Sequence, residues 1–197
     1  PAARPRRSGP PARRYRGRAV VTGRKLLFWA FAMAFPLPLV FVYDEVATEP
    51  PSLRIDLFFG LFAYAWWLLS VVLSVRPPWL ERWVGLPSIY GLHGMLGVLA
   101  LVAAYFHRDH AYAGNALARD LGDWAFYGAL GLLLYSAFFM SGWLVDRSRI
   151  GARVRRVLES VLRRRLSLWI HRLNLLLVAM IWLHVHLLVR VNQTSCS

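Results

Sequence analysis

Two stretches decide how this chain folds: LHGMLGVLALVAAYFH (Leu92–His107) and IHRLNLLLVAMIWLH (Ile170–His184). Each carries a histidine near both ends, and most residues between the histidines are apolar. A helix needs about 20 such residues to cross the hydrocarbon core of a bilayer. Because an ionisable side chain is costly in that environment, histidines in such runs indicate a functional site.

The composition of the whole chain agrees with a membrane protein. Of its 197 residues, 57% are hydrophobic, and the mean hydropathy is +0.42 despite a formal net charge of +14. A soluble domain has roughly 45–50% apolar residues. The apolar residues here form long blocks with the charges between them, which predicts an all-α, polytopic membrane helical bundle. The one cysteine, Cys196, excludes an intrachain disulfide framework and a CxxC motif.

Five apolar blocks predict five transmembrane helices, because each is about as long as the ~20 residues that a span requires. Pro36 and Pro38 interrupt the first block and predict a kink there. The blocks are Leu26–Tyr43, Leu57–Val75, Leu86–Phe106, Trp124–Val145 and Leu168–Val189.

The first 25 residues contain nine Lys and Arg residues among Pro, Gly and Ser. Such a segment buries little apolar surface, so we expect residues 1–25 to be a disordered tail. Next to a span, this tail is better explained as a cytoplasmic topology anchor that touches anionic membrane lipid than as a nucleic-acid-binding arm. The chain then divides into this tail, a transmembrane domain over 26–191 and a short extracytoplasmic tail over 192–197.

The charges between the blocks predict the orientation. Twenty of the 24 basic residues lie in the tail, in the second and fourth connections, and at Arg172. The other side of the predicted bundle carries seven of the ten acidic residues. By the positive-inside rule the N-terminus is cytoplasmic. The Arg- and Ala-rich composition suggests a bacterium, and so a multi-pass protein of the bacterial cell (plasma) membrane.

The histidines of spans three and five fall at two depths. His93 and His107 are 14 residues apart, and His171 and His184 are 13 apart, which is about 21 and 19.5 Å along a helix. Both spans run outward from the cytoplasm, so His93 is expected to face His171, and His107 to face His184. Two levels of paired imidazoles are what two bis-histidine b-type haems require.

Filled axial positions favour electron transfer over oxygen binding at iron. Hydrogen bonding between helices would explain a single intramembrane histidine, but not two matched pairs. Close clusters with the spacing of zinc ligands are absent from the sequence.

The outer ligand on span five is left open by helical phase. Thirteen residues, from His171 to His184, miss a full number of turns by ~140°, whereas fifteen, from His171 to His186, miss by ~60°. Phase alone therefore prefers His186, but helix tilt, or haems approached from different sides, would favour His184, so the residues themselves leave the choice close to even.

The two quoted stretches resemble the ferric reductase-like transmembrane domain superfamily, which includes NADPH oxidases, ferric reductases and the haem subunit of methionine sulfoxide reductase systems. The resemblance covers roughly residues 25–190, and its specific part is the paired spacing of 14 and 13. It implies a haem-binding transmembrane domain over 26–191. It also implies His93 and His171 as axial ligands of an inner haem iron, and His107 and His184 as those of an outer one.

The chain departs from the family pattern in two respects. Gly94 stands where members often have a basic residue after the first histidine, so Arg172 or Arg82 is expected to pair with a haem propionate instead. The family also normally has a sixth span, whereas this sequence predicts five. The sequence shows no GxGxxG loop, so FAD and NAD(P)H are expected only on a further domain or a partner.

The resemblance implies transmembrane electron transfer from a cytoplasmic flavin/NAD(P)H donor to an extracytoplasmic acceptor, either ferric iron or dioxygen. The chain would then be the membrane haem component of an oxidoreductase. One alternative is a haem-only membrane subunit that passes electrons to a periplasmic methionine sulfoxide reductase. Another, of a different class, is a non-redox membrane scaffold or transporter.

Overall fold

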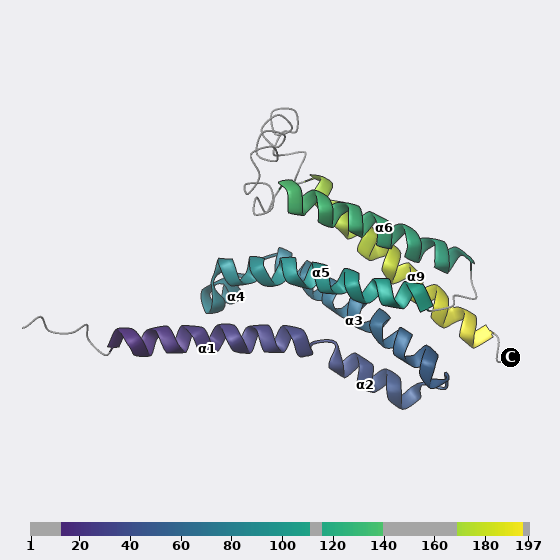
Figure 1. Cartoon of the computed structure of the whole chain (residues 1–197), viewed down its shortest axis with the longest axis horizontal. Helices are drawn as coiled ribbons and strands as arrows, with labels where there is room; N and C mark the ends of the chain where they lie inside the picture. Colours follow the sequence, from purple (N-terminus) through teal and green to yellow (C-terminus); the bar gives the residue numbers. More distant parts are fainter. Residues whose placement is uncertain (1–12, 111–115, 140–168, 195–197) are drawn as a thin grey trace, which may run out of the picture.

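A computed structural model describes residues 13–110, 116–139 and 169–194, which form helices joined by short turns, with no strand among them (Figure 1). Residues 169–172 form a helical turn before the last helix. The helices are α1 (Arg13–Ala34), α2 (Leu37–Val46), α3 (Pro51–Ser74), α4 (Pro78–Val84), α5 (Leu86–His110), α6 (Ala116–Phe139) and α9 (Asn174–Thr194).

Four segments of the described chain are long and apolar enough to cross a membrane, so the prediction of a multi-pass membrane protein is confirmed at that level. They are Gly23–Val46, Pro51–Ser74, Leu86–Asp109 and Trp169–Leu187. The other expected span, Trp124–Val145, overlaps α6 as far as Phe139 and then leaves the described residues. The basic connection over 146–167 lies outside them too.

The second half of the expected tail lies among the described residues. Helix α1 begins at Arg13, so residues 13–25 are helical and continue directly into the first apolar block. The physical reason is that this half lacks Pro, and the apolar residues that follow extend the helix already begun. Residues 1–12, and residues 195–197 of the expected outer tail, lie outside the described part.

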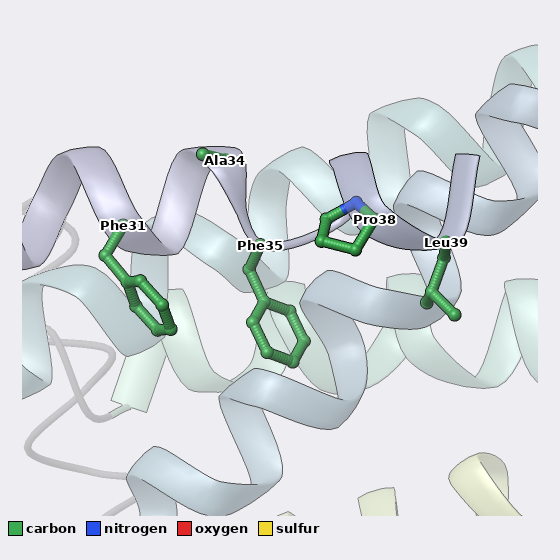
Figure 2. A pocket seen from close by; sticks show the side chains of 5 residues that line it. All are labelled: Phe31, Ala34, Phe35, Pro38 and Leu39. Atoms are coloured by element: carbon green, nitrogen blue, oxygen red, sulfur yellow. The ribbon is translucent and has the colours of Figure 1, made fainter. Parts of the chain in front are cut away.

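The predicted kink in the first block is present between α1 and α2. Proline lacks an N–H donor, so Pro36 and Pro38 each remove a helical hydrogen bond. The chain restarts with the N–H groups of Leu39 and Val40 both donating to the carbonyl of Pro36, at 3.1 and 3.2 Å. An apolar hollow of about 530 Å³ lies at this break, lined by Phe31, Ala34, Phe35, Pro38 and Leu39 (Figure 2).

The rest of the bundle is two antiparallel helix pairs, α3 with α5 and α6 with α9 (Figure 1). Helix α5 also packs on α6. Trp67 of α3 donates its Nε1–H to the Oδ1 atom of Asn174 at 3.2 Å, which ties the first pair to α9. Trp67 belongs to an apolar core that also includes Ala100 of α5, Ala129 of α6 and Leu177 of α9. Four helices therefore meet around one centre.

Large apolar side chains remain exposed along every helix, Leu27 and Phe41 among them at 62% and 68%. Soluble monomers rarely leave apolar surface on this scale in contact with water. This surface is what lipid would cover in a membrane.

Helices α6 and α9 approach each other closely at Gly128. A Cβ atom built there would lie 2.7 Å from Cδ2 of Leu177, a side chain that is only 8% exposed. Small residues commonly allow such approach between membrane helices. On the same helix, a Cβ atom at Gly131 would meet nothing within 4 Å.

We therefore expect Gly128→Val to lower the thermal denaturation temperature in detergent by several degrees, because overpacking a tight contact costs about 1–3 kcal/mol. Gly131→Val is the matched control, since the two changes alter helix propensity equally. Equal losses in both variants would show that helix propensity, and not the contact with Leu177, is responsible.

Candidate functional site: two histidine pairs

Four of the histidines form two pairs between α5 and the last helical segment. The ring centres of His93 and His171 are 5.9 Å apart, and the planes of the rings meet at 67°. Those of His107 and His184 are 6.2 Å apart, with the planes at 86°. Each pair joins one histidine from each helix, with the partners that the depth argument predicted.

The first pair is anchored by serines on the two flanking helices. The Nδ1 atom of His93 lies 2.9 Å from Oγ and 3.0 Å from the carbonyl oxygen of Ser70 on α3. That serine is only 3% exposed. The Nδ1 atom of His171 lies 3.2 Å from Oγ of Ser136 on α6. Because a carbonyl only accepts, the ring of His93 donates from Nδ1, which leaves its Nε2 lone pair free.

The second pair is anchored by main-chain carbonyls of the same two helices. His107 donates its Nδ1–H to the carbonyl of Asp56 on α3 at 3.0 Å. His184 donates its Nδ1–H to the carbonyl of Ala118 on α6 at 2.6 Å. Both rings are therefore held in the tautomer whose Nε2 atom carries the lone pair. A metal-ligating histidine almost always has such a second partner at its other nitrogen.

The spacing within each pair fits haem iron. An imidazole nitrogen binds a transition metal at about 2.0–2.1 Å and the ring centre lies about 1.1 Å beyond it, so two rings on opposite sides of one iron have centres about 6.3 Å apart. The observed 5.9 and 6.2 Å are close to this value. The angle between the ring planes would not be restricted by such ligation, because each imidazole can turn about its own bond to a metal.

The donor set also favours a haem over a free ion. Within residues 13–110, 116–139 and 169–194, no group of three or more His, Cys, Asp or Glu side chains could hold a metal ion. A structural zinc site needs four protein ligands and a catalytic one needs three. Two protein ligands suffice where a macrocycle supplies the remaining nitrogens, as in haem.

His186, the ligand that helical phase preferred, lies away from both pairs. Its side chain is exposed, its Nδ1–H donates to the carbonyl of Trp182 on its own helix at 2.8 Å, and its ring centre is 4.0 Å from that of Trp182. The structure thus brings His184, and not His186, to His107.

The phase argument failed because the helix is not regular between His171 and His184. Leu173 forms a turn, and its N–H donates to the carbonyl of Ile170; the N–H of Leu176 likewise donates to the carbonyl of Leu173. Such i to i+3 bonds advance the chain by about 120° per residue, compared with about 100° in an α-helix. The tighter winding at these residues supplies part of the ~140° of rotation by which thirteen regular residues fall short of four full turns. It also carries His186 further out of phase.

The two arginines expected at haem propionates make contacts within their own segments. Arg82 donates its Nε–H to the carbonyl of Pro78 on α4 at 3.2 Å. The guanidinium of Arg172 lies 5.1 Å from the ring centre of Trp169. Both side chains are exposed, and their pairing with propionates stays a prediction.

An ion pair lies beside the second pair of histidines. Arg108, which follows His107, donates its Nε–H to Asp123 of α6 at 2.6 Å and an Nη2–H to the hydroxyl of Tyr127 at 2.9 Å. The charged side chains are about one third exposed, so solvent screens the pair and it contributes at most ~1 kcal/mol. Its role is to hold α5 against α6 near the histidines.

Ser70 and Ser136 were missed by sequence reasoning. The available signal was a hydroxyl residue within an apolar block, where it needs a partner on a neighbouring helix. Assigning each serine to its histidine required the antiparallel register of the helix pairs, which the sequence does not give.

Comparison of the chain with models of protein families, with curated proteins and with solved structures found no match.

The positions of His184 and His186 predict opposite results for their substitution. Replacing His184 with Ala removes one member of a pair, so the haem content of purified protein should fall by about half. His186→Ala should leave the haem content unchanged. Haem quantitation after conversion to the pyridine complex measures both, and the reverse pattern would show that the 6.2 Å pair is not a ligand pair.

Proposed function

We propose that the chain carries electrons across a membrane through two haem b groups, each held between one histidine of α5 and one of the last helical segment. The observation that supports this most strongly is the spacing of the two pairs, 5.9 and 6.2 Å between ring centres, with a hydrogen-bond partner at Nδ1 of each ring. When bound, each haem would take up and release one electron at its iron.

The protein's own residues orient and enclose the sites. Ser70 and Ser136 hold the rings of the inner pair, His93 and His171, and the carbonyls of Asp56 and Ala118 hold those of the outer pair. In a membrane, the apolar helices around the partly buried rings would keep water away from them. Because two histidines would hold each haem, the group would supply electron transfer rather than substrate binding.

The orientation, the donor and the acceptor belong to the same proposal. The charge distribution supports a cytoplasmic N-terminus, which puts His93 and His171 on the inner side of the bacterial cell membrane. A cytoplasmic flavin that receives electrons from NAD(P)H, on a partner or a further domain, would supply the electrons. Ferric iron or dioxygen outside would receive them.

The test begins with purified protein that was produced with ample haem supply. We expect two low-spin b-type haems per chain by reduced-minus-oxidised spectroscopy with haem quantitation. His93→Ala and His107→Ala should each keep one. A protein that contains no haem would contradict the proposal and favour a non-redox scaffold or transporter.

Transfer across the membrane is tested separately in vesicles that contain the protein and an enclosed reductant. External ferric citrate should be reduced with the native protein, and not with His107→Ala, which would lack the outer haem. Reoxidation only by a periplasmic methionine sulfoxide reductase, and not by ferric iron or dioxygen, would identify the haem-only subunit instead.

The serine anchor predicts a shift in one haem only. A hydrogen bond from Nδ1–H raises the basicity of a ligating imidazole, and a more basic ligand stabilises the ferric form. Ser136→Ala should therefore raise the midpoint potential of the inner haem by tens of millivolts, as follows from ~0.5–1.5 kcal/mol for one hydrogen bond. Potentiometric titration measures this change, and the potential of the outer haem serves as the internal control. A shift of both potentials by the same amount would contradict a local role for the serine.

A further inference from the structure

Each histidine of the outer pair lies directly against a glycine of a neighbouring helix. A Cβ atom built on Gly60 of α3 would lie 2.9, 3.0 and 3.1 Å from Nδ1, Cε1 and Cγ of His107. A Cβ atom built on Gly122 of α6 would lie 3.1 Å from Cε1 and 3.2 Å from Nδ1 of His184. Both rings occupy the space that a side chain would need.

The same local arrangement occurs on both helices. The carbonyl that accepts the Nδ1–H of His107 belongs to Asp56, four residues before Gly60. The carbonyl that accepts the Nδ1–H of His184 belongs to Ala118, four residues before Gly122. A main-chain carbonyl lies closer to the helix axis than a side chain does, so a bare helix surface lets a ring approach it. In both cases the glycine provides that bare surface one turn later.

Contact with a histidine ring is not general among the glycines of the described helices. A Cβ atom at Gly94, Gly97 or Gly131 would meet nothing within 4 Å. At the inner level, His171 bonds to the hydroxyl of Ser136, which extends from the helix surface, and His93 lies within reach of both the hydroxyl and the carbonyl of Ser70. At the outer level, the two rings that reach main-chain carbonyls are therefore the two that lie against glycines. These glycines are Gly60 on α3 and Gly122 on α6.

We propose that Gly60 and Gly122 are positioning residues for the outer haem, because each admits an imidazole to a main-chain carbonyl and so fixes which nitrogen faces the iron. This inference rests on the proposed function. The two positions differ in tightness. Three ring atoms of His107 lie within 3.1 Å of a Cβ atom at position 60, whereas the nearest ring atom of His184 lies at 3.1 Å from one at position 122. Alanine is therefore more disruptive at position 60.

The experiment compares Gly60→Ala, Gly122→Ala and the control Gly131→Ala with the native protein. Alanine favours a helix over glycine by about 0.8–1.0 kcal/mol, so none of these changes should weaken its own helix. We expect Gly60→Ala to lose the outer haem, so that the haem content falls from two toward one per chain. Gly122→Ala should keep two haems with a shifted outer midpoint potential, and Gly131→Ala should match the native protein. The inner haem reports on correct folding in every variant.

Two results would overturn the positioning role alone. If Gly60→Ala and Gly122→Ala both keep two haems with native potentials, the rings do not depend on the bare surface. If either variant loses both haems while Gly131→Ala keeps them, the glycine serves general packing and not the outer site. A native protein without haem would instead contradict the proposed function, and the inference would fall with it.

Discussion

The hydrogen bond from each paired imidazole to a neighbouring helix is the interaction on which the rest of the site depends. A polar group buried among apolar side chains without a partner costs several kcal/mol, so each ring must reach an acceptor. For His107 and His184 that acceptor is a main-chain carbonyl of α3 or α6. These bonds orient the rings, and they also require the helix that offers the acceptor to lie within reach of the helix that carries the histidine.

That requirement explains why the bundle consists of two similar halves. Helix α3 anchors both histidines of α5, and α6 anchors both histidines of the last segment. Each half thus presents two fixed imidazoles, and the pairs form only where the halves meet. The hydrogen bond between Trp67 and Asn174 and the ion pair between Arg108 and Asp123 join the halves near those places. A group held by both members of a pair would join them further.

The sequence predicted those parts of the site that depend on depth, and missed those that depend on register. Hydropathy and charge give the depth of a residue in a span, which was enough to match His93 with His171 and His107 with His184. Helical phase assumes a regular helix, whereas the chain turns at Leu173, and the structure has His184 rather than His186 beside His107. The anchor Ser70 of His93, and the close contact of Gly60 with His107, could be assigned only once α3 was known to run antiparallel against α5. The start of α1 at Arg13 could not be predicted from hydropathy, because the many charges over 13–25 separate that stretch from the apolar block it continues into.

The two levels differ in what can alter them. The ring of His171 is anchored by the side chain of Ser136, so one substitution can remove its partner, and a hydroxyl can rotate to donate or accept. The rings of His107 and His184 are anchored by carbonyls, which no substitution removes and which only accept. Their orientation therefore depends on access to the main chain, and that access depends on Gly60 and Gly122. The orientation of His171 is thus set by the chemistry of a side chain, whereas that of His107 and His184 is set by the absence of one.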